Sequence, residues 1–444
     1  MTKARQDGLY LAILGALIFV LIGTALENAA PVSTVDFRVV YYSARCLLEH
    51  HDPYNISELQ GTYQSEHGET AKDTPTIRLT ETQYIYPPTA FSITALFALL
   101  PFWPAHILWL VITAFSVMTA AFLMWHSGAK HSPLCSGILT CLMLANSELF
   151  LILGNPAGLA ISFCVIAAWC FVERRFVAIG VVCLALSLAL KPHDSVFVWV
   201  YFFLAGGFYR KWALQSLAAL FCLALPATLW VTHIAPHWIH ELSLNLAANS
   251  AHGGLSDPGP ASMAAHGIGM VISLQSVFSM LWDNQGFYNL ASYLVSGALL
   301  LSWFIQTLQT RARAMPWYAL APIAALTMLP IYHRLYDAKL LLLAVPACCM
   351  LWERGQVAGR VAFVLTAGSL VLTGGVAWAF LLQVIAHLRL PANQVSRAFL
   401  IAVQVFPVPM LLLAVSIFYL WIYIRLSRGS VARQIDPKFA RESH

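Results

Sequence analysis

"MTKARQDGLYLAILGALIFVLIGTAL", residues 1–26, places two basic residues, Lys3 and Arg5, before an apolar run that starts at residue 9. A helix of about 17 to 25 apolar residues is long enough to cross the hydrocarbon core of a membrane. The run is followed by no convincing small-residue cleavage site, so we expect it to remain in the protein as a membrane helix and not to be removed as a signal peptide. This first segment therefore predicts a helical membrane protein.

The composition of the whole chain agrees with its first segment. Of 444 residues, 59% are hydrophobic and only 10% are charged, whereas soluble domains carry about 25% charged residues. The net charge of +5 is small and is better explained by a basic cytoplasmic rim than by nucleic-acid binding. Nine cysteines lie mostly within apolar runs without CxxC spacing, which is typical of small core residues. We predict one integral membrane domain over residues 1–444, with the lipid bilayer as a partner.

Thirteen apolar runs are candidates for crossing the membrane. Lys and Arg set the orientation, because cytoplasmic loops are enriched in them. Their distribution places both termini inside, which requires an even number of crossings. We therefore expect an all-α polytopic protein with about 12 transmembrane helices, and leave open whether the run 89–101 crosses. The runs are 9–26, 89–101, 104–126, 132–153, 155–172, 176–190, 193–208, 212–232, 289–308, 316–332, 335–352, 361–386 and 398–425.

Two long loops are predicted on the outside, and a basic tail, 426–444, inside. The first loop, 27–88, holds a large share of the acidic residues, while the second, 233–288, has five histidines and no Lys or Arg. Its pair His233 and His237 has the i, i+4 spacing of metal ligands, but no Cys or HExxH motif accompanies it. We therefore predict no metal and no cofactor.

The first loop begins with "STVDFRVVYYSARCLLEHHDPYN", residues 33–55. Apolar residues recur there at helical spacing, which predicts an amphipathic helix whose apolar face lies on the membrane. Ser33 followed by Asp36 resembles a capping box. Asp36 has two interpretations: an acid that stabilises the helix start, or a general base that accepts a proton from an attacking hydroxyl.

Polar residues at the ends of other apolar runs also have two interpretations each. Tyr84 and Tyr86, in "YIYPPTA", suit an interfacial aromatic belt or stacking on a sugar or lipid headgroup. Asn155 lies where "LGNPAGLA" breaks a hydrophobic hairpin, and Lys191, in "LALKPHDSV", suits a snorkelling anchor or a contact with phosphate.

A late cluster lies in "LPIYHRLYDAKLLLL", residues 329–343. His333, Arg334, Asp337 and Lys339 form either a short polar loop between two spans or a site that stabilises an anionic leaving group. Ionisable groups at membrane depth are costly and favour a functional explanation.

The order of these features resembles a known family. Over roughly residues 9–350, the chain resembles the bacterial polyprenyl-phosphate-mannose-dependent mannosyltransferases, glycosyltransferase family 87. The resemblance lies in the order of a first span, an acid, an amphipathic helix, "DPYN", "YPP", "GN", "KP" and then "HR" before a late span. The resemblance implies a GT-C architecture and transfer of mannose, or another hexose, from a polyprenyl-phosphate donor to an acceptor hydroxyl on a glycolipid or glycan. Transfer would invert the anomeric carbon, at the outer, periplasmic face of the bacterial inner (plasma) membrane.

The resemblance also implies roles for particular residues. Asp36 would be the general base and His333 would bind the donor phosphate. The chain departs from the family in having "GN" in place of "GQ" and "PIYHRLYDAK" in place of a Ser/Trp/His-rich run, which leaves the sugar and the acceptor open. Further phosphate contacts would be Arg334, Lys339, Lys191 and Arg45, and sugar or acceptor contacts would be Tyr84, Tyr86, Asn155 and His193.

Two other classes of function compete with this one. A lipid or sugar transporter, or flippase, also carries intramembrane charges and broken helices, but the acidic outer loop and the lack of repeat symmetry disfavour it. A lipid-linked oligosaccharide polymerase or ligase shares many spans and a large outer loop, but favours Arg-rich outer loops, and 233–288 contains no Arg.

Overall fold

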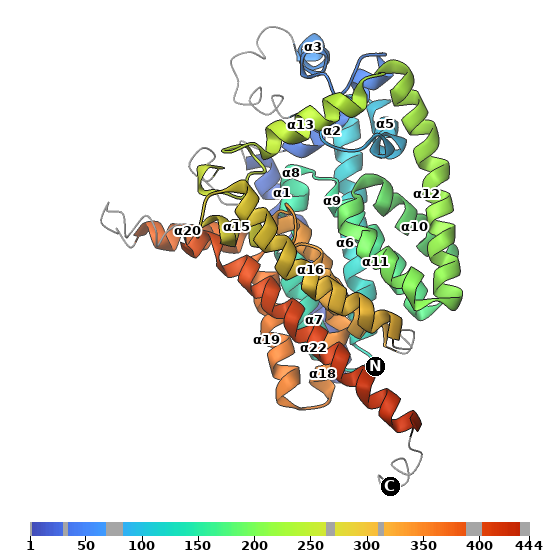
Figure 1. Cartoon of the computed structure of the whole chain (residues 1–444), viewed down its shortest axis with the longest axis vertical. Coiled ribbons are helices and arrows are strands. Elements are labelled where there is room, and N and C mark those ends of the chain that lie inside the picture. The colour runs from blue at the N-terminus through green and yellow to red at the C-terminus, as the bar shows by residue number, and fades with distance from the viewer. Residues whose placement is uncertain are drawn as a thin grey trace.

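The computed structural model describes residues 2–29, 34–67, 83–262, 271–309, 315–387 and 402–435, and the regular elements within these ranges are helices. The start of α1 (Lys3–Ala29) and the end of α22 (Pro407–Ile435) lie at the same end of the molecule, the bottom of Figure 1. α2 (Val35–Leu48), α3 (Ile56–His67) and α13 (Trp238–Ser250) gather at the opposite end, called the loop end below.

Seven helical stretches are long and apolar enough to cross a membrane, and five shorter apolar helices accompany them. The chain is thus an all-α polytopic membrane protein. The long stretches are α1, α6 (Phe102–Gly128), α7 (Pro133–Ala145) with α8 (Leu149–Leu153), α12 (Gly207–Ile234), α16 (Gln285–Gln309), η4 (Leu335–Ala344) with α18 (Val345–Glu353), and Pro407–Arg428 of α22. The shorter ones are η2 (Pro88–Ala90) with α5 (Phe91–Ala98), α9 (Ala157–Glu173), α10 (Val177–Leu190), α17 (Pro316–Leu326) and α19 (Val357–Leu372).

Burial separates the central helices from the outer ones. α9 and α17 are apolar on every side and almost wholly buried, as expected of helices enclosed by others. α1, α6, α12 and α16 instead expose large apolar side chains, including Leu21, Phe115, Phe221 and Leu294, which suits contact with lipid tails. α9, α17 and the largely buried η4–α18 stretch therefore form the centre of the bundle, and these four long helices lie toward its rim.

The first helix packs closely on α7 through glycines. A Cβ added to Gly15 would lie 2.7 Å from the Cα of Cys141, and one added to Gly137 would lie 2.5 Å from the Cα of Gly8. Small residues allow membrane helices to approach one another in this way. The first apolar run is therefore anchored in the bundle by its shape as well as by its hydrophobicity.

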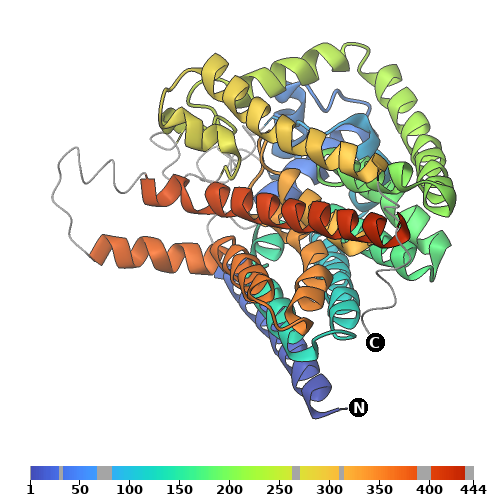
Figure 2. The same cartoon turned by 60° about the horizontal axis from the view of Figure 1, so that its bottom comes forward.

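The run 361–386, expected to be continuous, is interrupted. α19 ends at Leu372 and α20 (Gly375–His387) follows a break at Thr373–Gly374. Figures 1 and 2 show α20 extending sideways from the bundle. The glycine pair at 374–375 weakens helix continuity, because glycine has a high conformational entropy cost in a helix.

The amphipathic helix of the first loop exists as α2, but its surroundings differ from the prediction. Phe37, Tyr41, Tyr42 and Ala44 are buried against other protein elements and do not lie on the membrane. α3 and α5 both pack on α2 and cover it. The predicted capping box is wrong as well: Ser33 lies outside the described residues, and the N-cap is Thr34, which makes no side-chain capping hydrogen bond.

η4 departs from an ordinary membrane helix over ten residues. It is wound as a 3-10 helix, a form that rarely exceeds about four residues and often marks a functional position. In this form residues i and i+3 share a face, so Tyr336 and Lys339 lie one above the other. The following turns, α18, return to α-helical geometry.

Candidate functional site

Asp36 lies in the first turn of α2, held against the start of α9. The backbone N–H of Thr34 donates to the carbonyl of Ile152 at 2.7 Å, which fixes the start of α2 next to α8. The Asp36 carboxylate accepts a hydrogen bond from Nδ2 of Asn155 at 2.8 Å. Burial raises the pKa of Asp36 above its ordinary value, and the Asn155 hydrogen bond and the charges of Arg334 and Lys191 oppose that rise.

Asn155 connects three aromatic or acidic partners. Its Nδ2 donates to Asp36, to the hydroxyl of Tyr336 at 2.8 Å and, more weakly, to the hydroxyl of Tyr86 at 3.4 Å. Its Oδ1 accepts the backbone N–H of Ala157 at 2.8 Å, which orients the amide at the start of α9. The side chain is 3% exposed, so its hydrogen bonds are made to protein and its orientation is fixed.

Lys191 lies where α10 ends and α11 (Pro192–Ala205) begins. Its ammonium donates to Asp337, lies 3.4 Å from Oδ2 of Asp194 and lies 5.2 Å from the ring centroid of Tyr336. Lys191, Asp194 and Asp337 are all buried. Lys191 is therefore a paired interior charge, and the snorkelling interpretation is wrong.

The segment before η4 joins this cluster to the second long loop. The backbone N–H of Arg334 donates to Oδ2 of Asp337 at 2.8 Å, and its guanidinium bonds the hydroxyl of Tyr332 and the carbonyl of Leu255. The N–H of Ile272 donates to the carbonyl of His333 at 2.9 Å. The second long loop is therefore hydrogen-bonded to the site through Leu255 and Ile272.

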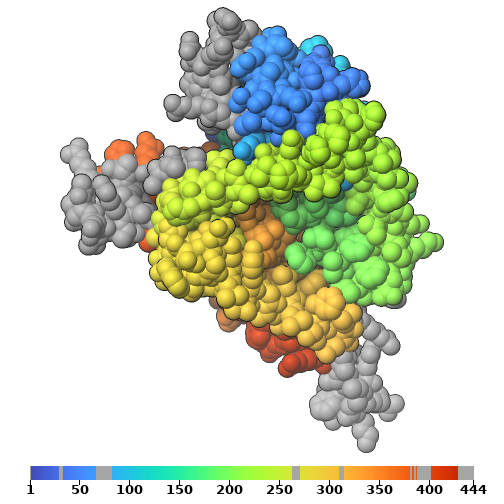
Figure 3. Space-filling model, turned by 45° about the horizontal axis from the view of Figure 1, so that its top comes forward, coloured from blue at the N-terminus to red at the C-terminus, as the bar shows by residue number. Residues whose placement is uncertain are grey.

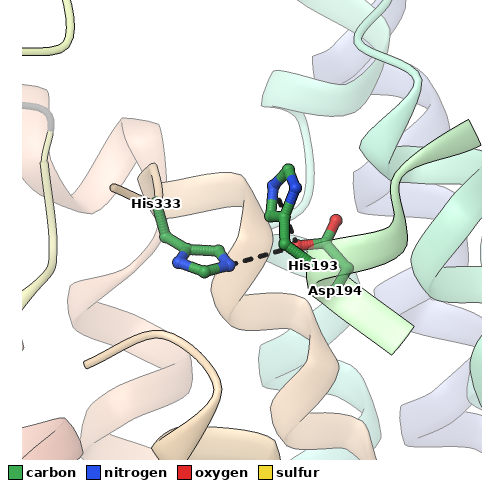
Figure 4. Close-up of side chains that lie close together, drawn as sticks. All are labelled: His193, Asp194 and His333. Atoms are coloured by element: carbon green, nitrogen blue, oxygen red, sulfur yellow. Dashed lines mark ion pairs between the residues drawn. The ribbon is translucent and has the colours of Figure 1, made fainter. Parts of the chain in front are cut away.

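His333 completes the cluster together with His193 and Asp194. Nε2 of His333 lies 3.4 Å from Oδ1 of Asp194, and Nε2 of His193 lies 3.7 Å from the same oxygen. The two imidazole rings are 5.0 Å apart, nearly edge to face. Figure 4 shows both rings directed toward the carboxylate, one from α11 and one from the segment before η4.

The charge of the cluster differs from the prediction. A predominantly cationic site was expected, but two permanent cations, Lys191 and Arg334, lie among three carboxylates, Asp36, Asp194 and Asp337. The physical reason is that an unpaired buried charge costs several kcal/mol, roughly. Lys191 is accordingly paired with Asp194 and Asp337, and Arg334 interacts electrostatically with Asp36.

Three of the predicted site residues lie elsewhere. Arg45 is nine residues beyond Asp36, about 13 Å along α2, where it pairs with Glu49 at 2.9 Å and lies 3.7 Å from Glu66, beside a surface hollow of about 390 Å³. Lys339 is buried one turn beyond Tyr336 and donates to the carbonyl and hydroxyl oxygens of Thr373, each at 3.1 Å. Tyr84 packs among Tyr54 and Phe91, and the backbone carbonyl of Tyr84 accepts a bond from Asn245.

The structure brings together Asp36, Tyr86, Asn155, Lys191, His193, His333 and Arg334, as their contacts above show. Sequence reasoning missed Asp194 and Tyr336 and gave no role to Asp337. The available signal was the pattern itself: "KPHD" and "YDAK" each place an acid within three residues of a lysine at the edge of an apolar run. Intramembrane acids of this kind are functional by default.

Comparison with protein-family models, with curated proteins and with solved structures finds no match for this chain. The fold and the site therefore define a class: an all-α polytopic membrane protein with a buried, mixed-charge site near its loop end.

Proposed function

We propose that this chain is a bacterial inner-membrane glycosyltransferase of GT-C architecture that moves a hexose from a polyprenyl-phosphate donor to an acceptor hydroxyl. The observation that carries the proposal is the placement of one acid, Asp36, near two interior cations. Asp36 is held by Asn155 within the electrostatic reach of Lys191 and Arg334, although the three residues come from distant parts of the chain.

The chemistry needs two oppositely charged functions close together. In an inverting transfer, the acceptor hydroxyl oxygen attacks the anomeric carbon, its proton passes to the Asp36 carboxylate, and the bond from that carbon to the phosphate oxygen breaks. A base whose pKa is raised toward the working pH accepts the proton more effectively. Lys191, Arg334 and His333 stabilise the negative charge on the departing polyprenyl phosphate.

Several hydrogen-bonding groups are placed to hold the sugar between these functions. Tyr86 and Tyr336 present hydroxyls to the Asn155 amide beside Asp36. His193 is 36% exposed, in contrast to its buried neighbour Asp194. Hydroxyl and imidazole groups at an otherwise buried site suit the polar edge of a hexose ring.

The architecture supports access to lipid and to the outer face. Seven long and five shorter apolar helices are consistent with 12 crossings. Figure 3 shows the surface hollowed between the green segment after α10 and the yellow-green to yellow band from α13 to α16, with orange atoms visible inside. A polyprenyl donor already in the bilayer enters there from the side, and the loop end faces the periplasm.

The test is replacement of the base by its isostere. Asp36→Asn keeps the shape but cannot accept the proton, so transfer from a polyprenyl-phosphate-hexose falls at least about 100-fold while donor binding persists. Rates and donor affinity are measured with purified protein in detergent or nanodiscs.

Asp52→Asn is the matched control, because Asp52 lies in the same loop and its Oδ1, which Asn retains, accepts the N–H of Tyr54. That variant is expected to keep wild-type turnover. Wild-type turnover by Asp36→Asn would remove the base from the proposal. A transporter would be favoured by two results together. The wild type would transfer no hexose from any polyprenyl-phosphate donor tested, and it would move sugar or lipid across the membrane of vesicles.

A further inference from the structure

His193, Asp194 and His333 form a cluster whose possible ligand atoms all lie within 4.8 Å of one another. Ligand atoms about 2.1 Å from a tetrahedral metal ion lie about 3.4 Å apart. The His333–Asp194 separation is 3.4 Å and the His193–Asp194 separation is 3.7 Å. These two pairs of ligand atoms already have near-tetrahedral spacing. The third pair, His193 and His333, would reach it by a small movement of the partly exposed His193 side chain.

The buried members of the cluster have atoms that no hydrogen bond occupies. Among the described residues, neither Nε2 of His333 nor Oδ2 of Asp194 has a hydrogen-bond partner, although His333 is fully buried and Asp194 is 2% exposed. Buried polar atoms are normally satisfied. Nε2 of His333 faces Oδ1 of Asp194 at 3.4 Å without a hydrogen bond, which indicates a ligand between them, whereas Oδ2 of Asp194 faces the ammonium of Lys191.

The surroundings of His333 favour metal ligation. Its Nδ1 lies 3.1 Å from the carbonyl oxygen of Ile331. Donation of Nδ1–H to that carbonyl leaves the lone pair of Nε2 directed at Asp194, the second-shell arrangement by which proteins orient ligating histidines. Lys191 lies 3.4 Å from Oδ2 of Asp194 and holds the carboxylate from the other side.

We infer that His193, Asp194 and His333 bind one divalent transition-metal ion, with Zn²⁺ the best fit. Two imidazole nitrogens and one carboxylate oxygen form a three-ligand set of the kind that leaves a coordination position open for a further group. His233 and His237, whose spacing drew attention in the sequence, are not part of this cluster.

The ion also resolves the charge balance of the site. Two cations lie among three carboxylates, and a divalent ion at this position adds positive charge to that of Lys191 and Arg334 and reverses the local sign. The open coordination position then accepts a phosphate oxygen of the donor, a role that rests on the proposed function. Metal binding itself does not depend on that function.

Zinc uptake by the purified full-length protein tests the inference. Metal-depleted protein is titrated with ZnCl₂ against a chromophoric chelator, and bound metal is counted by elemental analysis. Wild-type protein binds one zinc ion, and His193→Ala binds it about tenfold or more weakly, since even outer-shell changes cost that much. His193→Cys retains tight binding because a thiolate also ligates zinc. Thermal unfolding of each variant separates loss of metal from loss of fold.

His131→Ala is the matched control, because Nδ1 of His131 lies 2.8 Å from Glu353 in a histidine–carboxylate pair that has no third ligand among the described residues. It keeps wild-type zinc affinity. The site is overturned if the wild-type protein takes up no zinc. It is also overturned if His193→Ala and His193→Cys both bind zinc as the wild type does, or if both lose zinc equally.

Polyprenyl-phosphate binding with and without zinc separates the two proposals. Zinc that strengthens this binding supports the phosphate role, and zinc that binds without changing it contradicts that role alone. Absence of zinc binding together with Asp36-dependent transfer overturns the inference and leaves the proposed function standing.

Discussion

Asn155 is the residue on which the geometry of the site depends most. One amide orients the Asp36 carboxylate and the Tyr336 hydroxyl and is itself oriented by the N–H of Ala157. Hydrogen bonds to a charged group contribute about 1.5 to 3 kcal/mol each. Asn155 is thus a positioning residue whose hydrogen bond also favours the ionised form of Asp36.

Asn155→Ala is expected to shift the pH dependence of transfer. A base must be ionised, so kcat/KM falls as the pH drops through the pKa of Asp36, which burial has already raised. Loss of the Asn155 donor raises that pKa further, and the acid limb of the kcat/KM profile moves to higher pH by about one unit or more.

The pH profile of kcat/KM is also measured for the control variant Asn55→Ala. Asn55 lies in the loop after α2, and its Oδ1 accepts the N–H of Ser57. The control keeps the wild-type acid limb. An acid limb that stays in place in Asn155→Ala would mean that its hydrogen bond does not tune the base.

At the scale of elements, the turn between α8 and α9 positions α2. Gly154 ends α8 with φ of +65°, a conformation that glycine adopts without steric cost, and its carbonyl accepts a hydrogen bond from the indole of Trp109 at 2.9 Å. A Cβ on this residue would lie 2.6 Å from the Cβ of Phe37. The turn is therefore both strained for other residues and in contact with α2 beside Asp36.

Gly154→Ala is expected to destabilise the protein and to reduce transfer. The left-handed backbone costs about 1 to 2 kcal/mol for a residue with a Cβ, and the clash with Phe37 adds to this and displaces Asp36. Unfolding in detergent and turnover of the surviving folded protein are both measured.

Gly355→Ala separates the two contributions. Gly355 has φ of +66°, but a Cβ there meets nothing within 4 Å, so only the backbone cost applies and turnover is retained. If Gly154→Ala and Gly355→Ala have equal stability and turnover, the contact between residue 154 and Phe37 contributes to neither property.

At the scale of the whole molecule, the fold separates loops from termini. The start of α1 and the end of α22 lie at one end, and α2, α3 and α13 lie at the other (Figure 1). Two basic residues, Arg354 directly after α18 and Arg360 in the first turn of α19, agree with a cytoplasmic position for the end that holds the termini. With that orientation, the candidate site would lie nearer the periplasmic face, as the proposed function requires.

Cysteine accessibility tests this orientation. Cys222 is the exposed cysteine among the described residues and is replaced by Ser as background. In intact cells a membrane-impermeant maleimide is expected to label Gly61→Cys and Ser256→Cys, and to label Gln356→Cys only after permeabilisation. Gly61 suits the purpose because a Cβ there meets nothing within 4 Å. The opposite pattern would invert the topology.

Much of the fold follows from the sequence alone, because apolar length and Lys/Arg distribution act locally. Within the described residues, each of the thirteen apolar runs corresponds to helices, and the 361–386 run breaks where the glycine pair lies. Residues 398–401, the start of the last run, lie outside the described residues. Asp36, Asn155, Lys191 and the 333–334 pair were predicted as site residues partly because polar groups at the ends of apolar runs are costly, and partly from the resemblance to glycosyltransferase family 87. Their roles stay predictions.

Only the tertiary structure decided which polar residues meet. Asp36 and Asn155 are 119 residues apart and bond directly, while Arg45, on the same helix as Asp36, pairs with Glu49 instead. Lys191 pairs with Asp194 and Asp337, and two histidines converge on Asp194. These contacts depend on how α9 and α17, which each pack on both α11 and η4, bring the start of α11 toward η4. A sequence pattern shows what a residue requires: a buried charge, for example, requires a partner. Long-range packing determines which partner that charge obtains.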